Sequence, residues 1–140
     1  MSEKIKAYLL RADSSGQLYR GYIADVENSL AFEQRYVGDR IDVYSLTNNL
    51  DVIGGDEAVV MGRTLNRAVY DERGNFITVL AGNLMVVRYE GDSFASIHEE
   101  DVAVIEKMLK PIERIFNGKI FLRDVQELKI WEGKADEPAN

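Results

Sequence analysis

The sequence from residue 76 to residue 89 is FITVLAGNLMVVRY, and this stretch decides the fold class. Residues 76–80 and 84–89 are rich in β-branched and aromatic side chains, which favour strands. The tripeptide Ala81-Gly82-Asn83 separates the two runs, so the stretch is either two strands joined by a turn or one long strand bent at a bulge. In both cases we expect this part of the chain to be β-structure.

Short β-rich segments continue toward the N-terminus, each bounded by a turn signal. Asp13-Ser-Ser-Gly16 predicts the turn of an opening hairpin, and Gly54-Gly55-Asp56 predicts the turn of a second one. Residues 40–45 alternate in the manner of a half-buried strand. The expected strands are residues 5–11, 17–23, 40–45, 50–53, 58–61 and 68–70.

Two helices are expected, one early and one late. Asp25 is a suitable N-cap and Gly38 a suitable left-handed C-cap for a helix over about residues 26–36. Ser96, followed three residues later by Glu99, has the pattern of a capping box at the start of the late helix. Pro111 kinks or ends that helix because it lacks the N–H that bonds back to the preceding turn.

The end of the chain adds little regular structure. Asn117-Gly118 is a strong stop signal, residues 120–122 and 128–131 form a final strand or a strand with a packed extension, and residues 132–140 are expected to fray. The order predicts an α+β fold, a mainly antiparallel, curved β-sheet or partial barrel with one early and one late helix. We expect a single domain over residues 1–131.

Composition excludes several kinds of chemistry. The 140 residues include no cysteine and one histidine, so a thiolate zinc site, an iron–sulfur cluster and a histidine-rich metal site are excluded, and we expect no metal and no cofactor. The longest uncharged stretch, residues 74–87, is too short to span a bilayer, which favours a soluble cytoplasmic protein. The net charge of −7 argues against direct binding to nucleic acid or to an anionic membrane.

The basic residues are unevenly distributed. No lysine occurs between Ala7 and Glu106, where every basic residue is an arginine. Such a set is either an anion-binding face or a group of ordinary surface ion pairs. The arginines are Arg11, Arg20, Arg35, Arg40, Arg63, Arg67, Arg73 and Arg88.

Three short motifs together point to a family. They are Leu30-x-x-x-Gln34-x-x-Val37-Gly38-x-x-Ile41-Asp42, Gly62-x-x-Leu65-Asn66-Arg67, and Ala81-Gly82 followed by Gly91-x-x-Phe94-x-Ser96-Ile97-x-x-Glu100-Asp101. Their order and spacing resemble an uncharacterised bacterial family known as domain of unknown function number 3846, over about residues 5–109. The resemblance implies one compact α+β domain and implies no activity. It also implies an origin in Gram-positive bacteria or their mobile elements, where small accessory proteins are common.

The segment from Gly62 to Arg67 is the most site-like part of the sequence. Arg63, Asn66 and Arg67 on an irregular connection could bind an anion or a polar ligand. Alternatively, the asparagine holds a turn and the arginine caps a helix or pairs with an acid. Gln34 could contact a partner's backbone or could simply be solvated. Four positions have structural signatures: Gly38, Gly62, Gly82 and Ser96.

No residue has a catalytic signature. His98 precedes Glu99-Glu100-Asp101, but acids in the first turn of a helix are explained by the helix dipole. The leading hypothesis is therefore a non-enzymatic binding protein for a protein partner or a small polar, anionic ligand, with a homodimer possible. The alternatives are an acidic nucleic-acid mimic and a small hydrolase or lyase. The last would need a pocket with at least two of His98, Asp56, Glu57, Asp71 and Glu72.

Overall fold

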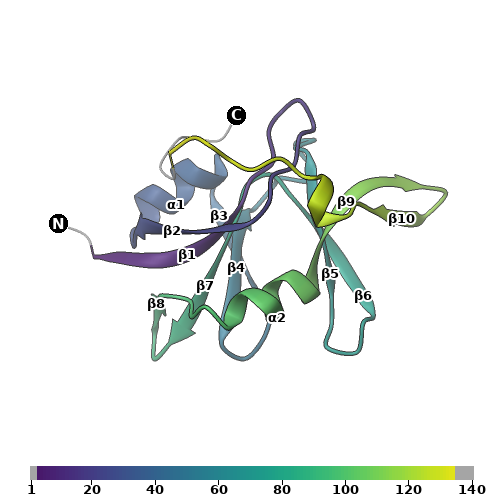
Figure 1. Cartoon of the computed structure of the whole chain (residues 1–140). Coiled ribbons are helices and arrows are strands. Elements are labelled where there is room, and N and C mark those ends of the chain that lie inside the picture. Colours follow the sequence, from purple (N-terminus) through teal and green to yellow (C-terminus); the bar gives the residue numbers. More distant parts are fainter. Residues whose placement is uncertain (1–2, 135–140) are drawn as a thin grey trace.

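The chain folds into two open antiparallel sheets with two helices (Figure 1). This computed structural model describes residues 3–134. The predicted α+β class, with one early and one late helix, is confirmed, and the β-structure is divided between two sheets that do not close into a barrel.

The first sheet contains the N-terminal strands. Its order is β2-β1-β7-β4-β3, with β8 paired to β7. All of its pairings are antiparallel. Its strands are β1 (Lys4–Leu10), β2 (Tyr22–Glu27), β3 (Ile41–Ser45), β4 (Leu50–Gly55), β7 (Leu84–Glu90) and β8 (Ser93–Ala95).

The second sheet has the order β10-β9-β5-β6. The stretch from residue 76 to residue 89 therefore passes from one sheet to the other, since β6 pairs with β5 and β7 pairs with β1 and β4. The Gly82 N–H bonds to the Thr64 carbonyl at 2.8 Å at this crossing. The strands are β5 (Leu65–Tyr70), β6 (Phe76–Ala81), β9 (Leu109–Phe116) and β10 (Lys119–Leu122).

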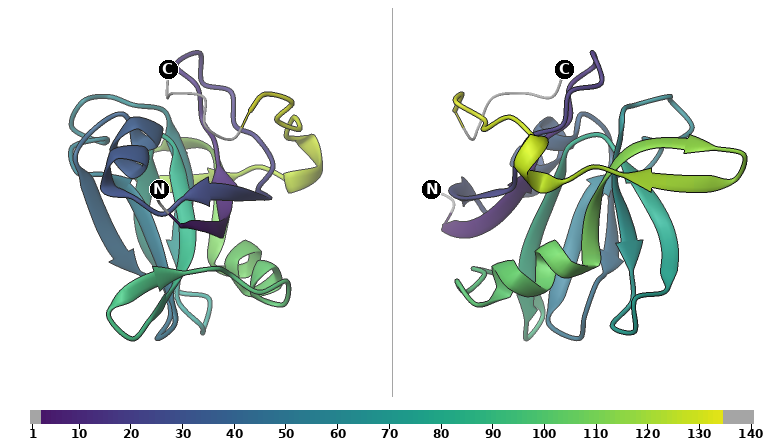
Figure 2. Two further views of the ribbon diagram at one scale, coloured as in Figure 1. Left: turned by 90° about the vertical axis from the view of Figure 1, so that its left-hand side faces the viewer. Right: turned by 45° about the vertical axis from the view of Figure 1, so that its right-hand side comes forward.

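Apolar side chains fill both faces of the first sheet. On one face, Phe32 and Tyr36 of α1 (Leu30–Val37) pack against residues of β1, β2, β4 and β7. On the other, Ile105 and Met108 of α2 (Asp101–Met108) pack with residues of both sheets. The two helices accordingly lie on different sides of the first sheet (Figure 2).

The early helix begins later than predicted. Residues 22–27 form β2 rather than the first turn of a helix, and Val26 is buried in the core beneath α1. The N-cap is Ser29, whose hydroxyl accepts the Phe32 N–H at 3.1 Å, so the expected cap at Asp25 is wrong. The predicted C-cap is confirmed, because Gly38 has a φ of 78° and donates to the Gln34 carbonyl at 2.8 Å.

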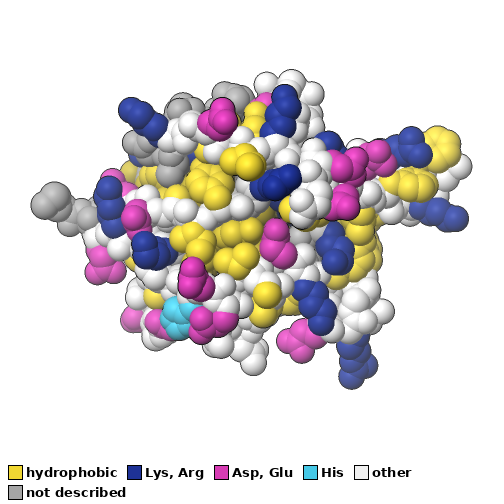
Figure 3. All heavy atoms as spheres, in the orientation of Figure 1, with side chains coloured by type: hydrophobic (Ala, Val, Ile, Leu, Met, Phe, Trp, Pro, Cys, Tyr) yellow, Lys and Arg dark blue, Asp and Glu magenta, His cyan; other side chains and the backbone are white. Residues whose placement is uncertain are grey.

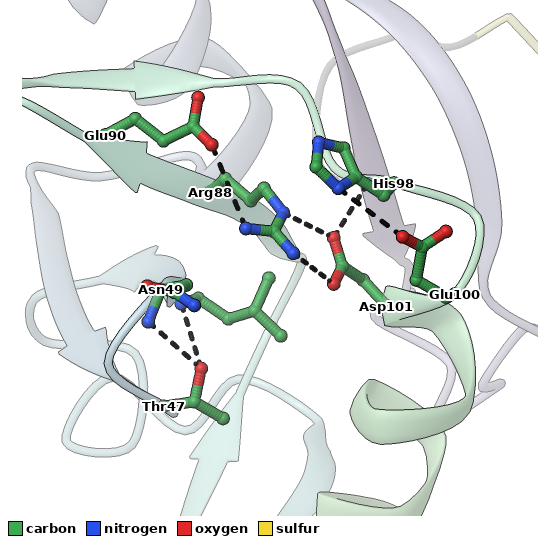
Figure 4. A network of polar contacts seen from close by, with 8 residues as sticks. Thr47, Asn49, Arg88, Glu90, His98, Glu100 and Asp101 are labelled. Atoms are coloured by element: carbon green, nitrogen blue, oxygen red, sulfur yellow. Dashed lines mark hydrogen bonds and ion pairs between the residues drawn. The ribbon is translucent and has the colours of Figure 1, made fainter.

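The late helix begins at Asp101, so the predicted N-cap at Ser96 is wrong. The Ser96 hydroxyl accepts the Lys6 N–H at 2.9 Å and thereby ties the segment before α2 to β1. Two 2.8 Å hydrogen bonds from Arg88 and one of 2.7 Å from the His98 N–H hold Asp101 instead (Figure 4). The helix ends before Pro111, as predicted, but Pro111 lies within strand β9.

Three further predictions are corrected. Residues 58–61 form a turn rather than a strand, and the two neighbours of β4 in the sheet are β3 and β7. Only the last part of the segment 17–23 is in β2, and residues 128–131 form no strand. Residues 120–122 do lie in a strand, β10, and Asn117-Gly118 is the turn that joins it to β9. Part of the predicted frayed tail, residues 135–140, lies outside the described residues.

Within the described part of the chain, no helix is long and apolar enough to cross a membrane.

Candidate functional site

The residues that the sequence singled out do not share one surface. Asn66 and Arg67 are fully buried, Arg63 is partly buried, and Gln34 is exposed on α1. Gly38 caps α1 and Gly62 lies in the turn before β5.

Asn66 is a cross-link in the protein interior. Its amide group donates to the carbonyls of Leu10 at 2.9 Å and Gly82 at 2.7 Å, and its side-chain oxygen accepts from Arg67 at 2.7 Å. Arg67 also donates to the Tyr19 carbonyl at 3.1 Å. Burial lowers the pKa of Arg67 to about 10, while the nearby Glu106 acts in the opposite direction. These side chains hold strands together and face no solvent.

The side chain of Arg63, from the segment before β5, reaches the C-terminal end of α1. Its guanidinium donates to the Gly38 carbonyl at 2.8 Å, where the negative end of the helix dipole favours a cation. Arg63 also lines a hollow of about 250 Å³, together with Asp13 and Ser14. Neither Asn66 nor Arg67 lines this hollow. Arg63 therefore acts on the helix end rather than with Arg67 on a shared ligand.

Two of the five acid–base candidates lie together. Asp71 and Glu72 line one hollow, whereas Asp56 lines another and His98 is exposed near the start of α2. A hydrogen bond from the Asn75 backbone lowers the pKa of Asp71, with a smaller contribution from the Asn75 side chain. A lowered pKa makes Asp71 a weaker base, which is the wrong direction for proton transfer near neutral pH. Within the described residues, no group of three or more His, Asp and Glu side chains is placed to hold a metal.

One concave feature is lined by residues of β3, β4 and β6. It consists of two hollows of about 180 and 330 Å³, which share the side chain of Tyr44, and we call it the β3–β6 groove. Residues of the smaller hollow include Asp42, Val52, Asp56, Val60 and Leu80. Residues of the larger hollow include Leu46, Tyr70, Asp71, Glu72, Ile77 and Met108.

Each sheet ends at this groove in an unpaired strand edge. Among residues 3–134, β3 is the last strand of the first sheet and β6 the last strand of the second. The Leu46 N–H donates to the Leu50 carbonyl, and the Asp56 N–H donates to the Arg40 carbonyl. These bonds show that the backbone N–H and C=O groups of the even-numbered residues of β3 point toward β4. The N–H of Val43 instead donates to the Asp42 carboxylate at 3.0 Å, outside the ladder. The backbone groups of the odd-numbered residues of β3 thus lie outside the β3–β4 ladder, and a further strand could pair with them if it displaced the Asp42 carboxylate from the Val43 N–H.

The groove has an apolar rim and an acidic lining. Val59, Val60 and Ile77 are 52%, 88% and 47% exposed around it. Its two hollows contain four acidic residues, Asp42, Asp56, Asp71 and Glu72, and one basic residue, Arg73, while Asp56 is paired with Arg40 at 3.0 Å. A ligand that fits this groove would carry apolar and positively charged groups.

The fold and the groove define a small, mostly-β α+β domain in which one edge strand of each sheet, β3 or β6, borders the groove. The chain belongs to the family described as a domain of unknown function, DUF3846, whose sequence profile matches residues 6–110. No curated protein and no solved structure matched the chain. The β3–β6 groove lies within the matched region, whereas most of β9 and all of β10 follow it.

Neither the position of the groove nor its edges could be read from the sequence. Residues 40–45 were correctly predicted as a strand, but a strand has no local signal that identifies it as the last one of a sheet. The apolar run 58–61 has the composition of a strand and predicts one, but the structure exposes Val59 and Val60 in a turn.

Proposed function

We propose that this protein is a non-enzymatic binding protein whose β3–β6 groove takes an extended, basic segment of a protein partner. The observation that carries the proposal is the free edge of β3 beside an acidic, apolar groove. An extended segment that pairs with an edge strand gains backbone hydrogen bonds, and its alternate side chains enter the adjacent hollows.

The alternation of β3 defines what such a segment would meet. Asp42 and Tyr44 lie on the face that lines the groove, and Val43 lies on the opposite face. A segment added at this edge would place every second side chain over Asp42 and the hollows. Basic residues at those positions would find the acidic lining, and apolar residues between them would meet Val43.

The two alternative functions have less support. Lys, Arg, Asp and Glu side chains are interspersed on the face shown in Figure 3, whereas a nucleic-acid mimic needs a continuous acidic surface. A hydrolase or lyase that used Asp71 as its base would need the pKa of this carboxyl group raised toward neutrality, and that pKa is lowered instead.

The test measures fluorescence anisotropy of labelled eight-residue peptides. A peptide of alternating valine and lysine should bind the wild-type protein, and one of alternating valine and glutamate should not. Val43→Pro removes an N–H that the β3–β4 ladder does not use, and Asp42→Lys reverses one charge of the lining. Each change should weaken binding by at least about tenfold, a loss near 1.4 kcal/mol.

Asp92→Lys is the matched control, because Asp92 is an exposed acid in the β7–β8 turn. It should leave binding of the valine–lysine peptide within about twofold of wild type. Circular dichroism confirms that each variant is folded. Equal binding of both peptides, or binding that neither β3 variant weakens, would overturn the proposal.

A further inference from the structure

The hairpin of β9 and β10 leaves the body of the protein as an arm. The pairing of β9 with β5 ends at Pro111, and beyond it residues 112–122 pair only with each other among the described residues. We call residues 112–123 the arm; it projects from the domain in Figures 1 and 2. An isolated two-stranded hairpin is at best marginally stable in water.

Both faces of the arm expose large apolar side chains. Cross-strand pairing places Ile115 beside Ile120 on one face and Phe116 beside Lys119 on the other. Ile115, Phe116, Phe121 and Leu122 are 45%, 61%, 37% and 39% exposed. Such a concentration of exposed apolar groups on an unsupported ribbon is typical of a surface that another molecule covers.

The charge of the arm is opposite to that of the rest of the chain. The arm has three basic residues, Arg114, Lys119 and Arg123, and one acidic residue, Glu113, while the whole chain has a net charge of −7. It is therefore an extended, apolar and basic segment, which is the chemistry that the β3–β6 groove fits. The groove contains four acidic residues and one basic residue.

We infer that the arm of a second copy of this chain occupies the β3–β6 groove. The inference rests on the proposed function, since it identifies a partner for the same groove. The arm cannot reach the groove of its own chain, because β10 and β6 are the opposite edges of one sheet and Arg123 holds the base of the arm to Pro111 by a 2.9 Å hydrogen bond.

A reciprocal exchange explains how two copies form a closed dimer. Each copy contributes one arm and one groove, so a two-fold axis generates two identical contacts. An arm and a groove from each copy amount to roughly the 20–30 residues a side of a standard protein interface. A partner's basic segment would compete with the arm for the same groove, so the dimer would open when that partner binds.

Sedimentation velocity between about 1 and 200 μM tests the inference, with the protein intact. The wild-type chain should dimerise, and Phe116→Ser in the arm and Asp42→Lys in the groove should each raise the dissociation constant at least about tenfold. Lys119→Glu in the arm should have a similar effect. A mixture of the Asp42→Lys and Lys119→Glu chains should recover a heterodimer, because one contact regains opposite charges and the other is native.

Two controls separate this arm–groove contact from other causes. Ile130→Ser removes an apolar side chain that is 65% exposed outside the arm and should leave dimerisation unchanged, as should Asp92→Lys. A labelled peptide of residues 110–123 should bind the Phe116→Ser protein and lose affinity when Asp42→Lys is added.

The outcomes distinguish the inference from the proposed function. A wild-type chain that is monomeric over the whole range overturns the exchange, while binding of the valine–lysine peptide would still support the groove. A dimer that Phe116→Ser abolishes and Asp42→Lys does not affect would mean that arms pair with each other, which also overturns it. Loss of both dimerisation and peptide binding in the wild-type protein would reject both proposals.

Discussion

At the residue scale, Asp101 is the one acid of Glu99-Glu100-Asp101 that anchors the start of α2 through hydrogen bonds from Arg88 and His98. Its carboxylate accepts two hydrogen bonds from Arg88 of β7 and one from the His98 backbone, and the side chains of Asp101 and Arg88 are only 7% and 16% exposed. A buried bidentate pair of this kind anchors the start of α2 to the first sheet. Glu90 contacts the same Arg88 at 3.8 Å but is 55% exposed.

Replacing Asp101 with asparagine should destabilise the protein in a pH-dependent manner. Burial alone would raise the pKa of Asp101, but hydrogen bonds from Arg88 and His98 outweigh it and the pKa is lowered. The carboxylate therefore stabilises the fold above its unfolded pKa, near 3.8, and this contribution is lost as the pH falls through the lower pKa of the folded state. Urea denaturation should show that the free energy of unfolding falls by about 3 kcal/mol at pH 7.

The difference between the variant and the wild type should shrink below about pH 4. Glu90→Gln is the matched control and should cost no more than about 1 kcal/mol, because its partner contact is exposed. A loss for Asp101→Asn that is the same at pH 3 and pH 7 would contradict the role assigned to the charge.

At the element scale, the entry into β2 depends on a close approach to β1. Gly21 immediately precedes β2, and a β-carbon at that position would overlap the ring of Tyr8. Tyr8 is itself buried in the core between the sheets and α2. A side chain at position 21 would therefore displace the Tyr8 ring from its place in the core.

Gly21→Ala should lower the stability by about 1–3 kcal/mol, because the Tyr8 ring must move within a packed core. Thermal unfolding followed by circular dichroism measures the change. Gly54→Ala is the comparison, since its nearest contact is a methyl group of Leu84 at 3.1 Å that can shift slightly. If the two substitutions lower the midpoint equally, the approach to Tyr8 is not the cause.

At the scale of the whole molecule, Asn66 connects the two sheets. It lies on β5 of the second sheet and bonds to Leu10, the last residue of β1 in the first, and to Gly82, where the chain crosses between them. The same side chain accepts a hydrogen bond from the buried Arg67. One asparagine thus satisfies buried groups from three parts of the chain.

Asn66→Ala should cost about 3 kcal/mol or more, because it leaves two buried carbonyls and one guanidinium N–H without their partner. Urea denaturation provides the measurement. Asn49→Ala is the control: Asn49 is exposed and bonds Thr47 through its backbone N–H, so its truncation should change stability by less than about 0.5 kcal/mol. A similar small loss at Asn66 would show that the sheets are held together by packing alone.

Much of the local structure was predictable because its causes are local. The composition of residues 76–80 and 84–89 indicated strands, the alternation of 40–45 indicated another, and Gly38 marked the end of a helix. The predicted start of the late helix was wrong because a distant residue competed with a local signal. Ser96 has the pattern of a cap, but its hydroxyl bonds to Lys6, ninety residues away in sequence.

The amino-acid sequence by itself determined the α+β class, the presence of an early and a late helix, and the family, because these depend on periodicity, on local backbone preferences and on short motifs. The tertiary structure alone decided that Arg67 and Asn66 are buried, that 76–89 crosses between two sheets, and that β3 and β6 end at a groove. Burial and edge position depend on which strands are neighbours in space, and pairing between distant segments is not encoded in any single stretch of the chain.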